Sequence, residues 1–449
     1  MNQQTSTRTE IIAGLTTFVT MAYILFVNPS VLSGTGMDKN AIFLATAIGA
    51  GIVCIIMGLF VKAPIALAPG MGLNAYFAVV ASSNGGLMNW QTALGAVFIS
   101  GIIFLILTIT GVRQALVDAI PDGLKHGITA GIGLFIAMLG FKLSELIQVQ
   151  ATPIPPTVDA LTKGPVDLKF FEWNLHLANF AHVHGNSGLV ALIGLLITGL
   201  LVIRNIKGGI LIGIILTTII GIPFGVTSLD ALKTASWMPD FSHNNFFALD
   251  LKGVLGIGIF EAIFVFTFVE LFDTFGTMVS TLDRAGILDQ PDGRQKLSKA
   301  MLVDATGVSI GALLGTSTIT AYIESAAGIE AGGRNGKTAI TVGVLFFLSL
   351  FIAPIAGIVP DAATAPALII VGVLMMQNIL RINFHDMLEA IPAFLTIVLM
   401  PLTGSIANGI SAGILFYTIL GASVGKKAHW IMWVLAIIVV IRYIFIGAA

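Results

Sequence analysis

Long apolar runs follow one another along almost the whole chain, from Ile11 to Phe445. Of the 449 residues, 56% are hydrophobic and only 10% are charged, a balance that no soluble domain of this size needs to fill its core. At ~1.5 Å per residue, each run is long enough to cross ~30 Å of hydrocarbon as a helix. The sequence therefore predicts an all-α polytopic membrane protein.

The apolar runs divide into about 14 predicted spans. We place them at 11–33, 41–61, 64–82, 92–112, 121–147, 186–203, 207–225, 254–281, 299–315, 316–334, 336–357, 361–380, 387–403 and 404–424. A further run at 429–446 is expected to form a short fifteenth span or an interfacial helix, unless the two segments before it are only partial spans. No cleavage-type sequence follows the first run, so we expect it to be a retained span.

Lys and Arg residues concentrate on alternate loops of this arrangement. With the N-terminus inside, most of them fall on inner segments, among them Arg8, Arg113 and Arg204. The positive-inside rule then predicts a multi-pass protein of the cell's inner (plasma) membrane with a cytoplasmic N-terminus. The longer polar segments 148–185 and 226–251 face outward in this topology.

The polar segments and the overall charge exclude several classes of partner. The outer segment 148–185 contains His176, His182 and His184, but neither a cysteine nor a tight carboxylate cluster accompanies them. We therefore expect solvated loop histidines, no metal site and no cofactor. The net charge of −1 and the lack of a basic patch argue against nucleic acid, and the single Cys54 excludes an intrachain disulfide.

Two glycine-rich segments match each other without a gap. They are residues 205–225, NIKGGILIGIILTTIIGIPFG, and residues 405–425, SIANGISAGILFYTILGASVG. The shared glycines are Gly209, Gly213, Gly221 and Gly225 in the first segment and Gly409, Gly413, Gly421 and Gly425 in the second. Earlier in each half, Ile120-Pro121-Asp122 and Val359-Pro360-Asp361 introduce another pair of similar spans. Similar composition could produce one such match, but the common glycine register favours a repeat.

We interpret these matches as two homologous halves, residues 1–225 and 226–449. If each half holds seven spans, an odd number, the halves must have opposite topology. Such inverted repeats are typical of secondary transporters, whose substrate site lies near the middle of the membrane. Discontinuous spans at that site leave backbone groups available to the substrate.

The third span and its counterpart in the second half both have the sequence of a broken helix. Residues 63–74 contain Pro64, Pro69 and two glycines, so they cannot form an uninterrupted helix. Residues 315–324 are rich in hydroxyl-bearing and β-branched residues and end at Glu324. Ser and Thr can bond back to helix carbonyls, but a carboxylate has no such local partner.

Three carboxylates lie at membrane depth: Glu270, Asp273 and Glu324. Each costs ~2.5–3.5 kcal/mol on insertion scales, so they indicate that the chain binds and moves something polar. Glu270 and Asp273 share a helix face by their i,i+3 spacing. Two anionic groups this close in a low dielectric repel, so we expect one to hold a proton at neutral pH, which is a basis for proton coupling. A permanently neutral or cation-paired carboxyl is the alternative, but the surrounding spans supply few Lys or Arg.

Three motifs occur in the order Ala68-Pro69-Gly70-Met71-Gly72-Leu73-Asn74-Ala75, then Phe268-Val269-Glu270-Leu271-Phe272-Asp273-Thr274-Phe275-Gly276-Thr277, then Thr318-Ile319-Thr320-Ala321-Tyr322-Ile323-Glu324-Ser325 with Gly332-Gly333-Arg334. Together they resemble the AzgA-like purine permeases, a group of the nucleobase–cation symporters. The resemblance implies the fold of the uracil permeases, with a core domain (spans 1–4 and 8–11) and a gate domain (spans 5–7 and 12–14). It also implies proton-coupled import of hypoxanthine, guanine or adenine by alternating access, and dimers through the gate domain are usual in related families.

The resemblance also implies roles for individual residues. Glu270, Glu324 and Asn74 would contact the purine, and Asp273 would carry the proton. Carboxylates accept from ring N–H groups, and an amide NH₂ can donate to ring nitrogens or a carbonyl. An alignment on Gly276 instead would exchange the roles of the two acids and make Asp273 the substrate acid.

The expected substrate-binding set has three further members. Thr318 and Tyr322 belong to the hydroxyl-rich broken span, and Phe77 could stack on the flat purine ring. Tyr76 could do the same, and ordinary packing is the alternative for both rings.

Other functions fit less well. A xanthine or uracil permease is the nearest alternative, followed by an anion transporter of the same architecture, such as a sulfate or bicarbonate carrier, which acids at the site centre oppose. An intramembrane enzyme is disfavoured because no predicted span offers a His-Glu metal cluster or a Ser/His pair at membrane depth. A channel is disfavoured because broken helices with central acids suit alternating access better than a continuous pore. We expect no enzyme activity, and the partners are a purine nucleobase, protons and the lipid bilayer.

Overall fold

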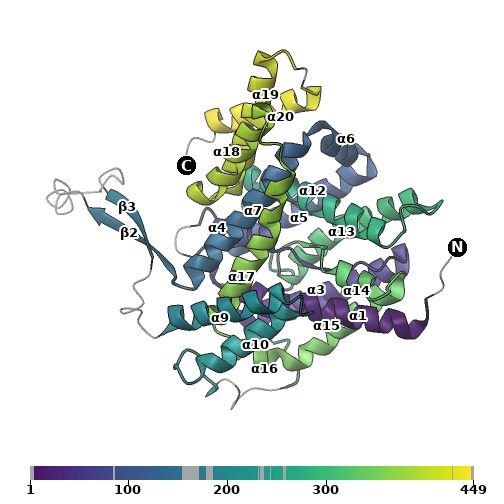
Figure 1. Cartoon of the computed structure of the whole chain (residues 1–449), viewed down its shortest axis with the longest axis vertical. Coiled ribbons are helices and arrows are strands. Elements are labelled where there is room, and N and C mark those ends of the chain that lie inside the picture. Colours follow the sequence, from purple (N-terminus) through teal and green to yellow (C-terminus); the bar gives the residue numbers. More distant parts are fainter. Residues whose placement is uncertain are drawn as a thin grey trace.

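The computed structural model describes residues 5–83, 86–153, 171–177, 186–230, 232, 237–242, 244–255, 259–426 and 428–445. Over these residues the chain is mostly helical, with two small sheets of two strands each (Figure 1). The side chains of 148–153, 171–177, 255, 259–262, 272–273 and 445 are outside this description.

The first half contains nine α-helices and three strands among the described residues. In chain order they are α1 (Thr7–Met21), α2 (Ile24–Ser33), α3 (Lys39–Ile56) with the π-turn η1 (Met57–Val61), β1 (Leu67–Pro69), α4 (Met71–Val80), α5 (Trp90–Ile109), α6 (Val112–Ala119), α7 (Asp122–Leu143), β2 (Ile147–Pro153), β3 (Phe171–Leu177), α9 (Ser187–Ile203) and α10 (Gly209–Gly221).

The second half follows a related order. It comprises η3 (Gly253–Leu255), α12 (Ile259–Arg284), α13 (Gly293–Leu314), β4 (Ile319–Ala321), α14 (Ser325–Glu330), α15 (Gly336–Ser349), η4 (Leu350–Ile352), α16 (Ala353–Ile358), α17 (Asp361–Met376), η5 (Gln377–Arg381), α18 (Met387–Thr403), α19 (Ile406–Ser423) and α20 (Trp430–Phe445).

Nine helical stretches in the described part are long and apolar enough to cross a membrane. They are Thr7–Ser33, Lys39–Val61, Trp90–Ile109, Asp122–Leu143, Ile263–Arg284, Gly293–Leu314, Gly336–Ile358, Asp361–Arg381 and Ile406–Ser423. Shorter apolar helices occur at Met71–Val80, Ser187–Ile203, Gly209–Gly221, Met387–Thr403 and Trp430–Ile444. A multi-pass helical membrane protein is thus confirmed.

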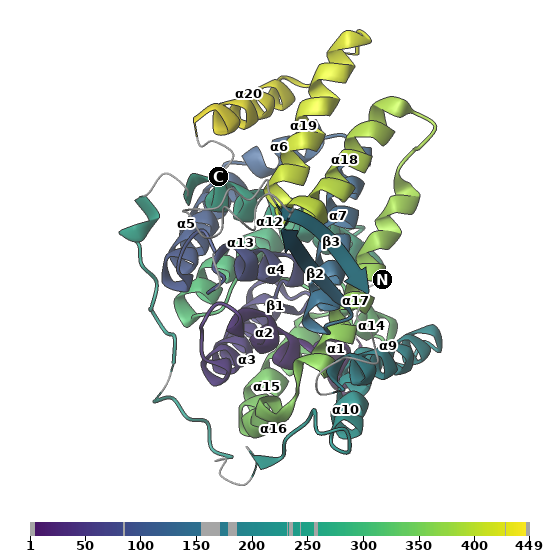
Figure 2. The same cartoon turned by 90° about the vertical axis from the view of Figure 1, so that its left-hand side faces the viewer.

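Several elements differ in detail from the expected spans. The span placed at 299–315 begins earlier, at Gly293, and the one at 336–357 changes to a 3-10 turn at Leu350–Ile352 before α16. Part of the polar segment 148–185 lies in the hairpin formed by β2 and β3, which periodicity did not predict. The terminal run forms α20, and Figure 2 shows this helix running across α19 rather than alongside it.

The helices pack into two groups. In the first, α7 and α17 lie along each other, between the α18–α19 pair at one end and the α9–α10 pair at the other (Figure 1). In the second, α5 packs on α12 and α13, while α15 packs on α1 and α3. Because lipid provides no hydrophobic drive for helix association, close backbone approach must supply much of this packing.

The matched glycines provide such approaches at equivalent places. A Cβ at Gly213 of α10 would collide with the Thr198 side chain of α9, and a Cβ at Gly413 of α19 would collide with the Thr396 side chain of α18. In each half, therefore, a glycine lets the second helix of a hairpin lie against a threonine of the first. The glycines that match between the two sequence segments thus make similar helix–helix contacts.

Candidate substrate-binding site

Two short strands from opposite halves of the chain meet inside the protein. Strand β1 pairs antiparallel with β4, with Leu67 opposite Ala321 and Pro69 opposite Ile319. Two hydrogen bonds extend the pairing, from Gly70 N to Thr318 O and from Tyr322 N to Ala66 O, each 3.0 Å long. Every residue of both strands is buried, so pairing satisfies backbone groups that have no water to bond to.

Each strand leads into a short helix, as expected for a broken span. Pro64 and Pro69 prevent a helix before β1 ends, and α4 starts at Met71. On the other side Gly315 ends α13 with a φ of 85°, a conformation that favours glycine, and α14 follows β4 from Ser325. The two interrupted spans therefore meet, which confirms that residues 63–74 do not form a continuous helix.

Glycine is also required where the two segments approach each other. A Cβ at Gly70 would lie 2.8 Å from Oγ1 of Thr320, which is closer than real side chains come. Residue 70 must therefore remain small for β1 and β4 to pair. We call the paired strands β1 and β4 the platform; β1 leads into α4, and β4 leads into α14.

Asn74 lies at the centre of a buried polar network. Its amide Nδ2 donates to Oδ1 of Asn28 over 2.7 Å, and its Oδ1 accepts from the Ser317 hydroxyl. Asn28 in turn donates to the hydroxyls of Thr46 at 2.7 Å and Thr316 at 2.9 Å. The expected substrate amide is thus engaged with α2 and with the segment before β4, so it holds the two broken spans together.

Glu270 is a completely buried carboxyl on α12. One turn further along, the Thr274 hydroxyl donates to the Glu270 carbonyl oxygen over 2.6 Å. One turn earlier, Phe266 packs edge-on against Tyr76 with ring centroids 5.1 Å apart, and Phe77 lies 6.4 Å from Phe266 at a tilt. These rings bring α4 against the helix that carries the acid. The side chain of Asp273 lies outside the described residues.

Tyr322 and Glu324 lie between β4 and α14. Oε1 of Glu324 accepts a 2.8 Å hydrogen bond from the hydroxyl of Tyr23, and this carboxyl is partly exposed. The Tyr322 hydroxyl donates to the Pro69 carbonyl over 2.5 Å, which fastens β1 to β4. Tyr322 therefore contributes to the pairing of β1 and β4. Glu324 has a protein partner and is also partly exposed.

Thr318 offers a polar atom to this region. Its side chain is fully buried, and its Oγ1 has no hydrogen-bond partner among the described residues. A buried hydroxyl without a partner costs about 1–3 kcal/mol, so a ligand that bonds to it recovers that cost. Thr318 therefore has a hydrogen-bonding group that a ligand can engage.

One charged pair was missed by the sequence reasoning, which placed Arg113 on an inner loop and left Asp304 unremarked. In the structure Arg113 of α6 is only 1% exposed, and its guanidinium lies 3.4 Å from Oδ2 of fully buried Asp304 on α13. The count of positive charges assigned Arg113 to one side of the membrane and did not predict that its side chain is buried. Asp304 falls within the predicted span 299–315, and an acid inside a span was the signal available.

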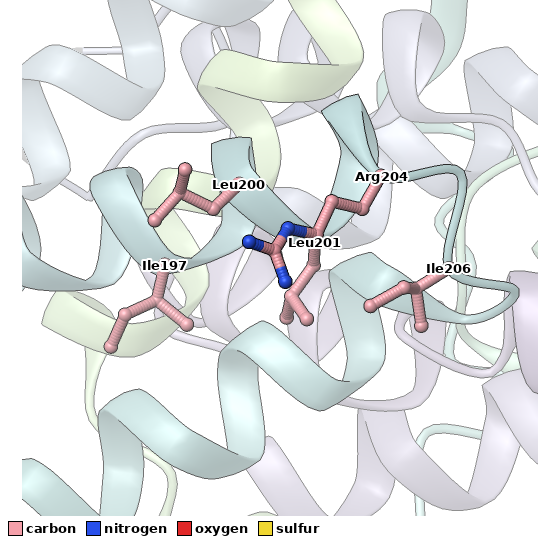
Figure 3. A pocket seen from close by; sticks show the side chains of 5 residues that line it. All are labelled: Ile197, Leu200, Leu201, Arg204 and Ile206. Atoms are coloured by element: carbon pink, nitrogen blue, oxygen red, sulfur yellow. The ribbon is translucent and has the colours of Figure 1, made fainter.

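The chemistry of a metal site is not found in the described part of the chain, where no group of three or more His, Cys, Asp or Glu could hold an ion. His182 and His184 lie outside the described residues, and so does the His176 side chain. A surface groove of about 280 Å³ is lined by Ile197, Leu200, Leu201, Arg204 and Ile206 at the end of α9 (Figure 3). None of these residues belongs to the site described above.

Comparison with known proteins decides the family. The model of the Permease family, Xan_ur_permease, matches residues 8–163 and 173–412. The chain belongs to this family. It is 39% identical to the adenine permease AdeP of Escherichia coli over 99% of this chain and 94% of that protein. It is 40% identical to the guanine/hypoxanthine permease PbuO of Bacillus subtilis over 98% of each.

A solved structure has the same fold. The transmembrane domain of a cyanobacterial bicarbonate transporter, BicA, superposes with a TM-score of 0.61, covering 91% of this chain and 97% of that domain at 17% identity. The resemblance to nucleobase permeases expected from the three motifs is confirmed by the family match. This permease is accordingly a membrane transporter and not an enzyme.

Proposed function

We propose that this permease is a proton-coupled secondary transporter that imports the purine nucleobases hypoxanthine, guanine or adenine by alternating access. The main observation behind the proposal is that β1 and β4 pair beside α12, the helix that carries the buried Glu270. Two broken spans come together there, with a partly accessible Glu324 and a Thr318 hydroxyl that has no hydrogen-bond partner in the described part of the chain. The chain is similar over almost its full length to relatives named as adenine and guanine/hypoxanthine permeases, which supports a purine as the substrate.

The proposed architecture is two inverted seven-span repeats, residues 1–225 and 226–449. The antiparallel register of β1 with β4 and the equivalent contacts of Gly213 and Gly413 support a twofold relation between the halves. We assign one packing group to a proposed core of spans 1–4 and 8–11 and the other to a proposed gate of spans 5–7 and 12–14, an assignment that the helix contacts support. Sliding of the core against the gate would then expose the site to each side of an inner membrane, with the N-terminus cytoplasmic.

Recognition of the purine follows from hydrogen-bond chemistry. Ring N–H groups would donate to the carboxylates of Glu270 and Glu324, and the Thr318 hydroxyl would bond a ring nitrogen or exocyclic group. Asn74 has a second amide N–H beyond the one given to Asn28, and this group can donate to the ring. Phe77 and Tyr322 would contribute mainly by shaping the site, because Phe77 packs near Phe266 and Tyr322 bonds to Pro69.

Uptake into cells that lack their own carriers tests this function. Labelled hypoxanthine, adenine and guanine should accumulate, whereas labelled sulfate and bicarbonate should not. A competition panel that adds xanthine and uracil would identify the preferred base. Uptake dominated by xanthine or uracil would replace the purine assignment with the nearest alternative, and anion uptake would overturn it.

An anion carrier has one observation in its favour, the fold shared with a bicarbonate transporter. A similarity at 17% identity concerns the fold alone. The buried carboxyl of Glu270 would repel an anion at the centre of the site, so we favour the nucleobase.

Proton coupling is the part of the proposal that rests on Asp273. We expect Asp273→Asn to retain measurable purine binding and to lose accumulation driven by a pH gradient, because the amide neither takes up nor releases a proton at physiological pH. A pH-sensitive dye inside proteoliposomes would report proton entry when hypoxanthine is added. Acidification at the wild-type rate would remove Asp273 from this role and leave Glu270 as the proton carrier.

A further inference from the structure

We propose that Arg113 is a positioning residue of the transport site, which holds Asp304 in place so that Asp304 fixes the β4 strand. This inference rests on the proposed function for its binding readout. It concerns an arginine on the short helix α6, which joins α5 to α7 and so connects the proposed core and gate domains.

The environment of Arg113 is unusual for a residue between two spans. The side chain is 1% exposed, although its neighbour Val112 is 42% exposed. One face of the guanidinium is covered by the ring of Phe104 on α5, whose centroid lies 4.2 Å from Cζ. The group thus gives up water for a cation–π contact and a small number of polar partners, a costly arrangement that needs specific compensation.

The polar partners of Arg113 all belong to α12 and α13. Its NH2 group donates to Oγ1 of Thr274 over 2.9 Å and lies 3.4 Å from Oδ2 of Asp304, while NH1 lies 3.5 Å from the Met301 carbonyl. Arg113 therefore connects α12, through Thr274, to α13, through Met301 and the buried acid Asp304.

Asp304 connects Arg113 to the candidate site. Its second oxygen, Oδ1, accepts a 3.2 Å hydrogen bond from the backbone N–H of Ala321 in β4. Ala321 is paired with Leu67 of β1, so the contact chain runs from α6 through α13 to both strands of the platform. Removing the guanidinium leaves a buried carboxylate without its counter-charge, and such a group moves or takes up a proton.

The sequence offers a matched control for this charge. Arg284, at the end of α12, makes a 3.5 Å ion pair with Glu330 of α14, but the two side chains are 58% and 66% exposed. Pairs exposed to that extent contribute little, because water screens them. The same Arg-to-Gln substitution at 284 therefore removes a cation near the same elements without disturbing a buried acid.

The test compares Arg113→Gln, Asp304→Asn, the double variant and Arg284→Gln with the wild-type protein. In purified, folded protein we expect Arg113→Gln and Asp304→Asn each to weaken binding of the preferred purine at least tenfold. The double variant should lose at least tenfold less than the product of the two single losses, because Gln and Asn amides can bond to each other without a buried charge. Arg284→Gln should bind with wild-type affinity.

A second readout needs no substrate. Hydrogen–deuterium exchange over residues 319–324 of the ligand-free protein should be faster in Arg113→Gln and unchanged in Arg284→Gln. If Arg113→Gln cannot be recovered folded, the double variant carries the test, with weaker binding and faster exchange than wild-type expected.

Wild-type affinity and wild-type exchange in Arg113→Gln, or in the double variant where it stands in, would overturn the inference. So would losses in the double variant that equal the product of the single losses. Failure of the wild-type protein to bind any purine would instead reject the proposed function, and the exchange measurement would still decide the link from Arg113 to β4.

Discussion

The backbones of Gly133 and Gly372 touch where α7 crosses α17. A Cβ at Gly133 would lie 2.7 Å from the Gly372 carbonyl oxygen, and a Cβ at Gly372 would lie 2.5 Å from the Gly133 carbonyl oxygen. Gly133 lies 11 residues beyond Asp122, where α7 begins, and Gly372 lies 11 residues beyond Asp361, where α17 begins. A reciprocal contact between equivalent positions is what twofold-related helices make, and only glycine fits there.

Gly372→Ala should therefore destabilise the protein. The added methyl group must push α17 away from α7 against backbone atoms, and overpacking of this kind costs ~1–3 kcal/mol. A lower Tm of the detergent-solubilised variant would show it. Gly199→Ala on α9 is the control, because a Cβ there meets nothing within 4 Å. Equal melting temperatures for both variants and wild-type would mean that the crossing is not tightly constrained.

Glu324→Gln should remain in the membrane and lose high-affinity purine binding. The amide has the same volume but presents a donor where a ring N–H needs an acceptor. Loss of a charge-assisted hydrogen bond is worth ~1.5–3 kcal/mol, roughly a ten- to hundredfold weakening of Kd. Calorimetry with the purified variant measures it, and Glu330→Gln at the end of α14 is the exposed control. Unchanged affinity would make Glu324 a structural residue that accepts the hydrogen bond of the Tyr23 hydroxyl.

Thr318→Val should weaken purine binding without loss of stability. The two side chains have nearly the same shape, and Oγ1 of Thr318 bonds to nothing among the described residues, so only a ligand contact is lost. A neutral hydrogen bond is worth ~0.5–1.5 kcal/mol, about a two- to tenfold rise in Kd.

The control for Thr318 is Thr46→Val, which removes an acceptor used by Asn28 over 2.7 Å. That change should lower the free energy of unfolding by ~1–3 kcal/mol, because a buried amide donor is left unsatisfied. A lower Tm for Thr318→Val, with wild-type affinity, would contradict the assignment of Thr318 to the substrate.

A loop ion pair outside the spans should make stability depend on acid pH. The carboxylate of Asp386 accepts from the Leu388 N–H at 3.0 Å and lies 3.1 Å from Nζ of Lys426. The Leu388 hydrogen bond first, and the bond to Lys426 second, hold the pKa of Asp386 below its usual value. A depressed pKa means stabilisation that is present above the unfolded-state pKa and is lost as pH falls through the folded-state pKa.

Asp386→Asn should accordingly melt at a slightly lower temperature than wild-type at neutral pH. The difference should shrink below about pH 4, where the wild-type carboxylate also becomes protonated. Melting curves from pH 7 down to the acid limit of the detergent-solubilised protein would measure it. A gap that stays constant or widens with acidification would contradict the role given to this carboxylate.

Local sequence determined much of the architecture and part of the site. Apolar runs of bilayer length predict helices because lipid cannot satisfy a bare backbone. Pro64, Pro69 and Gly70 predict an interruption because proline removes the N–H that a helix needs. The acid on α12 and the acid before α14 could be identified as candidates because charge is costly at membrane depth.

Other features depended on contacts between residues far apart in the chain. The motif around Asn74 predicts a substrate-binding amide, but the fold brings Asn28 to its amide nitrogen and Ser317 to its amide oxygen. Arg113 follows the fourth predicted span as one of many positive charges on inner segments, but α6 brings its guanidinium within 3.4 Å of Asp304 on α13. Hydropathy and spacing describe the chain one segment at a time, so they locate broken helices and costly acids. Which groups meet, and which polar atom is left for a ligand, is decided only when the packed helices bring those segments together.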